Sequence, residues 1–113
     1  MKIICSLVAK STAASEQFMP LEEPESRRVW ELYMTGTLKE IYLRTDEIGA
    51  VIILNCGSKP EAETAISSLP MVKAGLFDLS YIQLGEWSEM TRMLGEHQQP
   101  IPNWYPSEAA HSI

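Results

Sequence analysis

The feature that most constrains this chain is an unbroken apolar run, Ala50-Val51-Ile52-Ile53-Leu54. Its length and its β-branched residues are typical of a strand. Successive side chains of a strand point to opposite faces, so a strand with one face in water should alternate apolar with polar residues. A continuous apolar run indicates instead that both faces are buried. We therefore expect a sheet that is covered on both sides.

The rest of the chain predicts three more strands and two helices around this run. Gly36 and Pro70 are suited to ending helices, and Ser58 lies three residues before Glu61, which is the spacing of a capping box. The order strand-helix-strand-strand-helix-strand is the split βαβ arrangement of ferredoxin-like α+β folds. The predicted strands are residues 2–9, 38–45, 49–56 and 76–84; the predicted helices run from about 23 to 36 and from 58 to 70; residues 10–20 are a polar connector and 46–49 a hairpin loop.

In this arrangement a four-stranded antiparallel sheet carries both helices on one face and leaves the other face bare. Nothing in a monomer covers the second face of the apolar run. A second copy stacked sheet to sheet would cover it, and a chain of 113 residues buries only about two-thirds of its unfolded surface by itself. We therefore expect a homodimer or a larger homo-oligomer.

The chain divides into a folded domain, residues 1–85, and a C-terminal tail, residues 86–113. Trp87, Met90 and Leu94 recur at helical spacing, which predicts a short helix at the start of the tail. Three prolines, at positions 100, 102 and 106, favour an extended segment after it.

Charge and motif content exclude several classes of protein. The net charge is −6 and no basic stripe is present, which argues against nucleic-acid partners and anionic membranes. No apolar stretch approaches the about 20 residues of a membrane span, and the N-terminal run is too short and interrupted for a secretory signal, so we expect a cytoplasmic protein. Cys5 and Cys56 lack metal or redox spacing and are expected to be buried thiols. His97 and His111 have no companion ligands, so neither a metal nor a cofactor is expected.

Strand 38–45 carries the first candidate site. By alternation, Ile41 and Leu43 face the helices, while Glu40, Tyr42 and Arg44 share the bare face at intervals of about 7 Å. There Glu40 could remove a proton next to a carbonyl, while Tyr42 and Arg44 stabilise the resulting enolate or hold a carboxylate. Alternatively, Glu40 and Arg44 only protect and solvate an edge strand.

Further candidates lie outside that strand. Glu25 shares a helical stripe with Val29 and Leu32, so its carboxylate is either turned inward or only complements the helix dipole. The remaining candidates are expected to contact a substrate, with core packing or solvent exposure as the alternative for the aromatic residues and the lysine. Ile52 and Leu54 are expected on the bare face near Tyr42, and Lys73 in a loop before the fourth strand. The remaining candidates are Trp30, Tyr33, Ile52, Leu54, Lys73 and Trp87.

From Glu25 to Pro70 the chain resembles muconolactone isomerase, a small member of the dimeric α/β-barrel superfamily. The resemblance is carried by Leu32-x-x-x-Gly36-Thr37, by the aromatic Tyr42, by Ser58-Lys-Pro-Glu-Ala62 and by Leu69-Pro70. It implies a cofactor-free enzyme that shifts a lactone double bond by proton transfer, with Glu25 at the position of the family's helix glutamate. The family's tyrosine and asparagine of the third strand fall at Ile48 and Ala50, and its strand histidines are absent.

These observations lead to one hypothesis and two alternatives. The leading hypothesis is a cofactor-independent enzyme that isomerises or cyclises an oxygenated small molecule through an enolate, with Glu40 or Glu25 transferring the proton. The alternatives are a cofactor-free monooxygenase on the same barrel and a non-catalytic module that binds a small ligand or mediates assembly.

Overall fold

The computed structural model describes residues 1–95. The predicted extended segment after position 99, together with His97 and His111, lies outside these residues. The elements follow in the order β1 (Lys2–Ala9), α1 (Ser15–Phe18), a 3-10 turn (Met19–Leu21), α2 (Glu22–Met34), β2 (Leu38–Leu43), β3 (Gly49–Asn55), α3 (Lys59–Ser67), α4 (Pro70–Lys73), β4 (Phe77–Leu84) and α5 (Ser88–Gly95).

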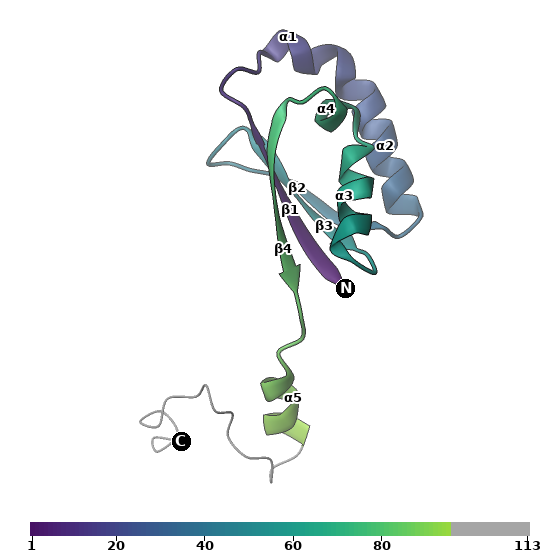
Figure 1. Cartoon of the computed structure of the whole chain (residues 1–113), viewed down its shortest axis with the longest axis vertical. Coiled ribbons are helices and arrows are strands. Elements are labelled where there is room, and N and C mark those ends of the chain that lie inside the picture. Colours follow the sequence, from purple (N-terminus) through teal and green to yellow (C-terminus); the bar gives the residue numbers. More distant parts are fainter. Residues whose placement is uncertain (96–113) are drawn as a thin grey trace.

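The four strands form one antiparallel sheet in the order β2-β3-β1-β4. Helices α2 and α3 lie on the same side of this sheet, and β2 is an edge strand (Figure 1). The predicted ferredoxin-like α+β fold is therefore confirmed. Ser58 caps α3 as predicted, since its hydroxyl accepts a hydrogen bond from the Glu61 amide.

The core lies between the sheet and the two long helices. Alternate residues of the two central strands supply most of it, and α2 and α3 close it with Leu32, Ala62 and Ile66. Both cysteines are buried free thiols, as predicted, and burial raises the pKa of Cys5 to about 11. The central-strand residues of the core are Ile3, Cys5, Leu7, Ile52 and Leu54.

The opposite face of the sheet is apolar at its centre but is not covered by either helix (Figure 1). Ile4 pairs with Ile53 on one side and with Ile82 on the other, so three isoleucines form a row across three strands. Ile82 is 57% exposed, and Val51, in the next row, is only partly buried. We call this surface, made by Ile4, Val51, Ile53 and Ile82, the open sheet face.

Two expectations from the sequence are wrong, and one segment has structure that was not predicted. Ile52 and Leu54 were expected on the bare face near Tyr42, but both are buried on the helix side. Ile52 pairs with Ile41, whereas Tyr42 pairs with Val51 on the open sheet face. The polar connector 10–20, for which no secondary structure was predicted, contains α1 and leads into the 3-10 turn. The expected loop around Lys73 is the helix α4, because Pro70 is accepted in the first turn of a helix as readily as it ends the previous one.

The predicted tail helix is present as α5. It follows the end of β4 and lies away from the sheet and from the other helices (Figure 1). Among residues 1–95, none of the helices has the length and apolar character needed to cross a lipid bilayer.

Candidate functional site

A cavity of about 450 Å³ opens between α2 and the helix side of the sheet. The cavity exists because α2 does not cover all of the apolar side chains on the helix side of the edge strand β2. Ile41 is 43% exposed and Leu43 is 84% exposed. Both face the helix side, as predicted, but they form a cavity wall rather than core. We call this space the α2 cavity; its lining comprises Leu7, Phe18, Glu22, Glu25, Ser26, Val29, Ile41, Leu43, Ile48, Gly49, Ala50, Ile52, Met71 and Phe77.

Glu25 is the best-defined polar group of the α2 cavity. Its Oε1 accepts a hydrogen bond from the backbone amide of Met71 in α4 at 2.9 Å. None of the residues that the structure describes donates a hydrogen bond to Oε2. One oxygen is therefore held by the protein, which leaves the other free to receive or give a proton.

The surroundings of Glu25 favour its protonated form. Partial burial among Val29, Met71 and Phe77 raises the pKa of its carboxyl group, and the hydrogen bond from the Met71 amide opposes this by stabilising the charge. A carboxyl group with a raised pKa is better matched to accept and return protons near neutral pH. Of the two interpretations of Glu25, the structure supports the inward-turned carboxylate.

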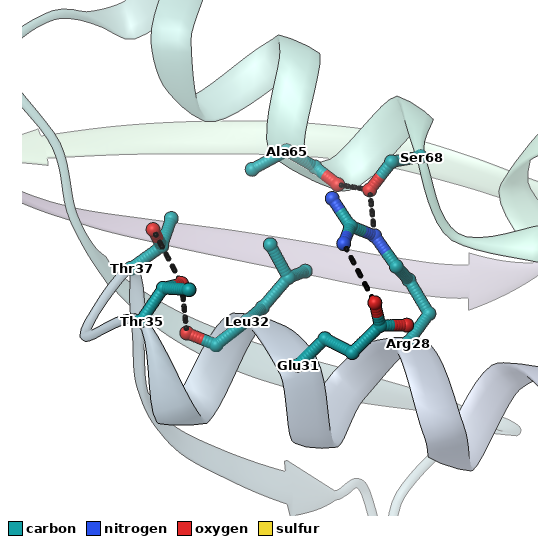
Figure 2. Close-up of polar contacts among 7 residues, drawn as sticks. All are labelled: Arg28, Glu31, Leu32, Thr35, Thr37, Ala65 and Ser68. Atoms are coloured by element: carbon teal, nitrogen blue, oxygen red, sulfur yellow. Dashed lines mark hydrogen bonds and ion pairs between the residues drawn. The ribbon is translucent and has the colours of Figure 1, made fainter.

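The position of α2 over the sheet is secured by a polar contact with α3. Arg28 Nε donates a hydrogen bond to Ser68 Oγ at 2.8 Å, and Ser68 Oγ donates to the carbonyl oxygen of Ala65 at 2.6 Å (Figure 2). Glu31 adds an ion pair to Arg28 at 3.6 Å. Because Glu25 lies one turn before Arg28 on the same helix, this contact also holds the turn of α2 that carries Glu25 close to the sheet.

The sequence did not single out several cavity residues. Phe18 packs against Phe77 with ring centroids 5.6 Å apart, and Met71 lies beside Glu25. The signal for Phe18 was its position as an aromatic residue in an otherwise polar connector. Met71 and Phe77 carried no comparable signal, because only the packing of α4 and β4 against α2 brings them to the cavity.

Glu40, Tyr42 and Arg44 lie together on the open sheet face, as predicted, and not in the α2 cavity. The Tyr42 hydroxyl donates a hydrogen bond to the Glu40 carboxylate, and this hydrogen bond, together with the charge of Glu40, raises the pKa of Tyr42. Arg44 is bound to the hairpin loop through Asp46 at 2.6 Å and Glu47 at 3.0 Å, which lowers the pKa of Asp46 to about 2. These contacts fit the protective role of charged residues on an edge strand.

The other candidates are dispersed. Trp30 and Tyr33 stack on each other at 5.7 Å on the exposed surface of α2, and Leu54 is core. Lys73 and Trp87 are exposed and do not line the α2 cavity. Of the predicted site residues, the α2 cavity brings together only Glu25 and Ile52. Among residues 1–95, no group of three or more His, Cys, Asp or Glu side chains is placed to hold a metal ion.

Comparison with known proteins supports the architecture. No family model and no curated protein matches the sequence. Among solved structures, the chain is similar to 5-chloro-2-hydroxyhydroquinone dehydrochlorinase from Burkholderia phenoliruptrix in complex with 2,5-dihydroxybenzoquinone, with a TM-score of 0.65, 13% identity and coverage of 79% of this chain and 98% of that one. It is also similar to muconolactone isomerase, with a TM-score of 0.63, 12% identity and coverage of 76% and 90%. The resemblance to muconolactone isomerase is thus confirmed at the level of the fold.

Proposed function

We propose that this chain is a cofactor-independent enzyme that isomerises or cyclises a small oxygenated molecule by proton transfer in the α2 cavity. The observation that carries the proposal is the environment of Glu25: one carboxylate oxygen is held by the Met71 amide, the other has no donor among the described residues, and the wall is largely apolar. The sequence analysis offers two glutamates for proton transfer, Glu40 and Glu25, and the α2 cavity favours Glu25.

The proposed step needs no external oxidant or reductant. The Glu25 carboxylate takes a proton from a carbon next to a carbonyl group, and the C–H electron pair moves into an enolate. The protonated Glu25 then returns the proton to a different atom of the same substrate. Substrate and product have the same composition, and Glu25 is restored to its starting state.

The proposed substrate is a ring of modest size that carries carbonyl or hydroxyl oxygens. The structural neighbour from Burkholderia phenoliruptrix binds a dihydroxybenzoquinone, which is a compound of this kind. Ile48 and Ala50 line the α2 cavity at the positions where the muconolactone isomerases that the chain resembles have polar residues. We therefore propose a substrate other than muconolactone.

We also propose that the working protein is a homodimer or larger homo-oligomer. The row Ile82–Ile4–Ile53 places three apolar side chains together on the open sheet face, and burial of such a surface is the usual driving force for stable association. Stacking of two copies through these faces would leave the α2 cavity, on the other side of the sheet, open to substrate.

Glu25→Gln tests the proposal. Glutamine retains the acceptor for the Met71 amide but cannot take a proton, so we expect turnover to fall about 100-fold or more while ligand affinity stays within a few-fold. Affinity is measured by NMR titration with 2,5-dihydroxybenzoquinone. Turnover is measured with a panel of hydroxylated quinones, hydroquinones and unsaturated lactones. The reaction is followed by the change in absorbance and by NMR, and the product of an isomerisation has the same mass as the substrate.

Glu40→Gln is the matched control, since it removes the same charge from the open sheet face. It should leave turnover unchanged. Loss of turnover in Glu40→Gln but not in Glu25→Gln would transfer the chemistry to the other face of the sheet. Ligand binding without turnover of any panel member would identify a binding module, and substrate-dependent oxygen uptake would identify a monooxygenase.

A further inference from the structure

A second cavity, of about 460 Å³, lies beside the α2 cavity. The two share Phe18 and Ile48 as lining residues, so these two side chains form the boundary between them. Ile48 is 79% exposed and therefore has little packing that would hold it in place. We call the second space the Lys10 cavity; besides the shared pair it is lined by Val8, Ala9, Lys10, Ser11, Ala13, Ser15 and Glu47.

Three polar groups of the Lys10 cavity have no partner within the described part of the protein. The Lys10 ammonium group forms no ion pair, and neither Ser11 nor Ser15 forms a side-chain hydrogen bond among residues 1–95. The backbone of Lys10 is nevertheless fixed, because its amide donates to Leu76 O at 2.9 Å and its carbonyl accepts from the Ala13 amide at 3.0 Å. A partly buried lysine with a fixed backbone and an unpaired ammonium group, in a cavity that two serines also line, is suited to bind an anionic oxygen group.

The charges of the two cavities have opposite signs. The charged residues that line the α2 cavity, Glu22 and Glu25, are both acidic. In the Lys10 cavity the one lining carboxylate, Glu47, is already paired with Arg44 at 3.0 Å. An anionic group on a ligand is therefore favoured in the second cavity, where the Lys10 ammonium group is unpaired among the described residues, over the first, which has no basic lining residue, and this would fix the direction in which the ligand lies.

We propose that the substrate carries a carboxylate on a short side chain, and that Lys10 binds this carboxylate while the ring occupies the α2 cavity. Lys10 is then a specificity-determining residue, assisted by the hydroxyls of Ser11 and Ser15, and Ile48 lies where the side chain passes from one cavity to the other. This inference rests on the proposed function for the location of the ring, but it concerns binding and not the chemical step.

The test compares two ligands that differ in one charge, 3-(2,5-dihydroxyphenyl)propanoate and its primary amide. For the wild-type protein we expect the acid to bind about tenfold more tightly than the amide, as measured by calorimetry or NMR titration. Lys10→Met should abolish this preference by weakening only the acid, and Lys10→Arg should restore most of it. Circular dichroism and the melting temperature establish that each variant is folded.

Lys73→Met is the matched control, because it removes an exposed lysine that lines neither cavity. It should retain the preference for the acid. The inference is overturned if the wild-type protein does not distinguish the two ligands or binds neither, or if Lys10→Met retains the preference. Glu25→Gln separates the two proposals, since it should keep the preference even though it abolishes turnover; an unchanged turnover with a preserved preference would reject only the proposed function.

Discussion

At the scale of single residues, Glu25 combines two opposing influences. Burial disfavours its charged form, whereas the Met71 amide stabilises it, and the first effect is the larger because the pKa is raised. The closest contrast is Asp46, an exposed carboxylate whose pKa is lowered to about 2 by the Arg44 guanidinium. The surroundings of two acids of similar intrinsic strength thus shift their pKa values in opposite directions.

The raised pKa of Glu25 predicts how stability depends on pH. The folded protein holds this proton more tightly than the unfolded chain does, so the contribution of Glu25 to the free energy of unfolding is present below the unfolded pKa. It is lost as the pH rises through the folded pKa. Glu25→Gln removes this dependence, and we expect the variant to be at least as stable as the wild type at pH 7.

Two measurements check this prediction. Carbon-13 NMR titration of the Glu25 carboxyl should give a midpoint above the ordinary glutamate value of 4.5. Urea unfolding of wild type and variant between pH 4 and 8 should show the wild type losing stability relative to Glu25→Gln as the pH rises. A midpoint at or below 4.5 would contradict the account of its environment.

At the scale of elements, the start of β3 tolerates no side chain. A Cβ atom added at Gly49 would lie 2.0 Å from the carbonyl oxygen of Leu7 in β1. Because that neighbour is backbone, the two strands must separate to accept even alanine. We expect Gly49→Ala to lower the free energy of unfolding by about 3 kcal/mol, as overpacking in a core does, measured by urea denaturation.

Gly85→Ala is the control for this element. It follows β4, and an added Cβ would meet nothing within 4 Å. Its stability should equal that of the wild type within the error of the measurement. If Gly49→Ala were as stable as Gly85→Ala, the close pairing of β1 with β3 at this position would be incorrect.

At the scale of the whole molecule, the open sheet face predicts association. Ile53→Asp places a charge in the middle of the row Ile82–Ile4–Ile53, where a second copy would leave it buried without a partner. We expect the wild type to have at least twice the chain mass of 12.7 kDa at micromolar concentration, and Ile53→Asp to have a single chain mass. Light scattering coupled to size-exclusion chromatography measures both.

Ser67→Asp adds the same charge to an exposed position on α3 and should leave the assembly intact. A wild-type protein that remains a 12.7 kDa species at micromolar concentration would reject the oligomer. So would an Ile53→Asp variant that is folded and keeps the wild-type mass.

The candidate site was only partly accessible from the sequence. The inward position of Glu25 follows from its helical stripe with Val29 and Leu32, because side chains three to four residues apart share a helix face. Ile52 and Leu54 were placed on the wrong face. In a run that is apolar throughout, no alternation of apolar and polar residues shows which side chains point to which side of the sheet. The Lys10 cavity gave no signal, as it is formed by the end of β1, the connector and the hairpin loop together.

The sequence by itself determined the order of the four strands and the two long helices, the cap of α3, and the inward faces of the helices. These depend on alternation, helical spacing and capping residues, which act between neighbours a few positions apart. Only the tertiary structure decided which carboxylate meets a cavity and which cation remains unpaired among the described residues. Those outcomes depend on contacts between distant segments, such as the hydrogen bond that joins Glu25 to Met71 across 46 positions, and no local pattern encodes them.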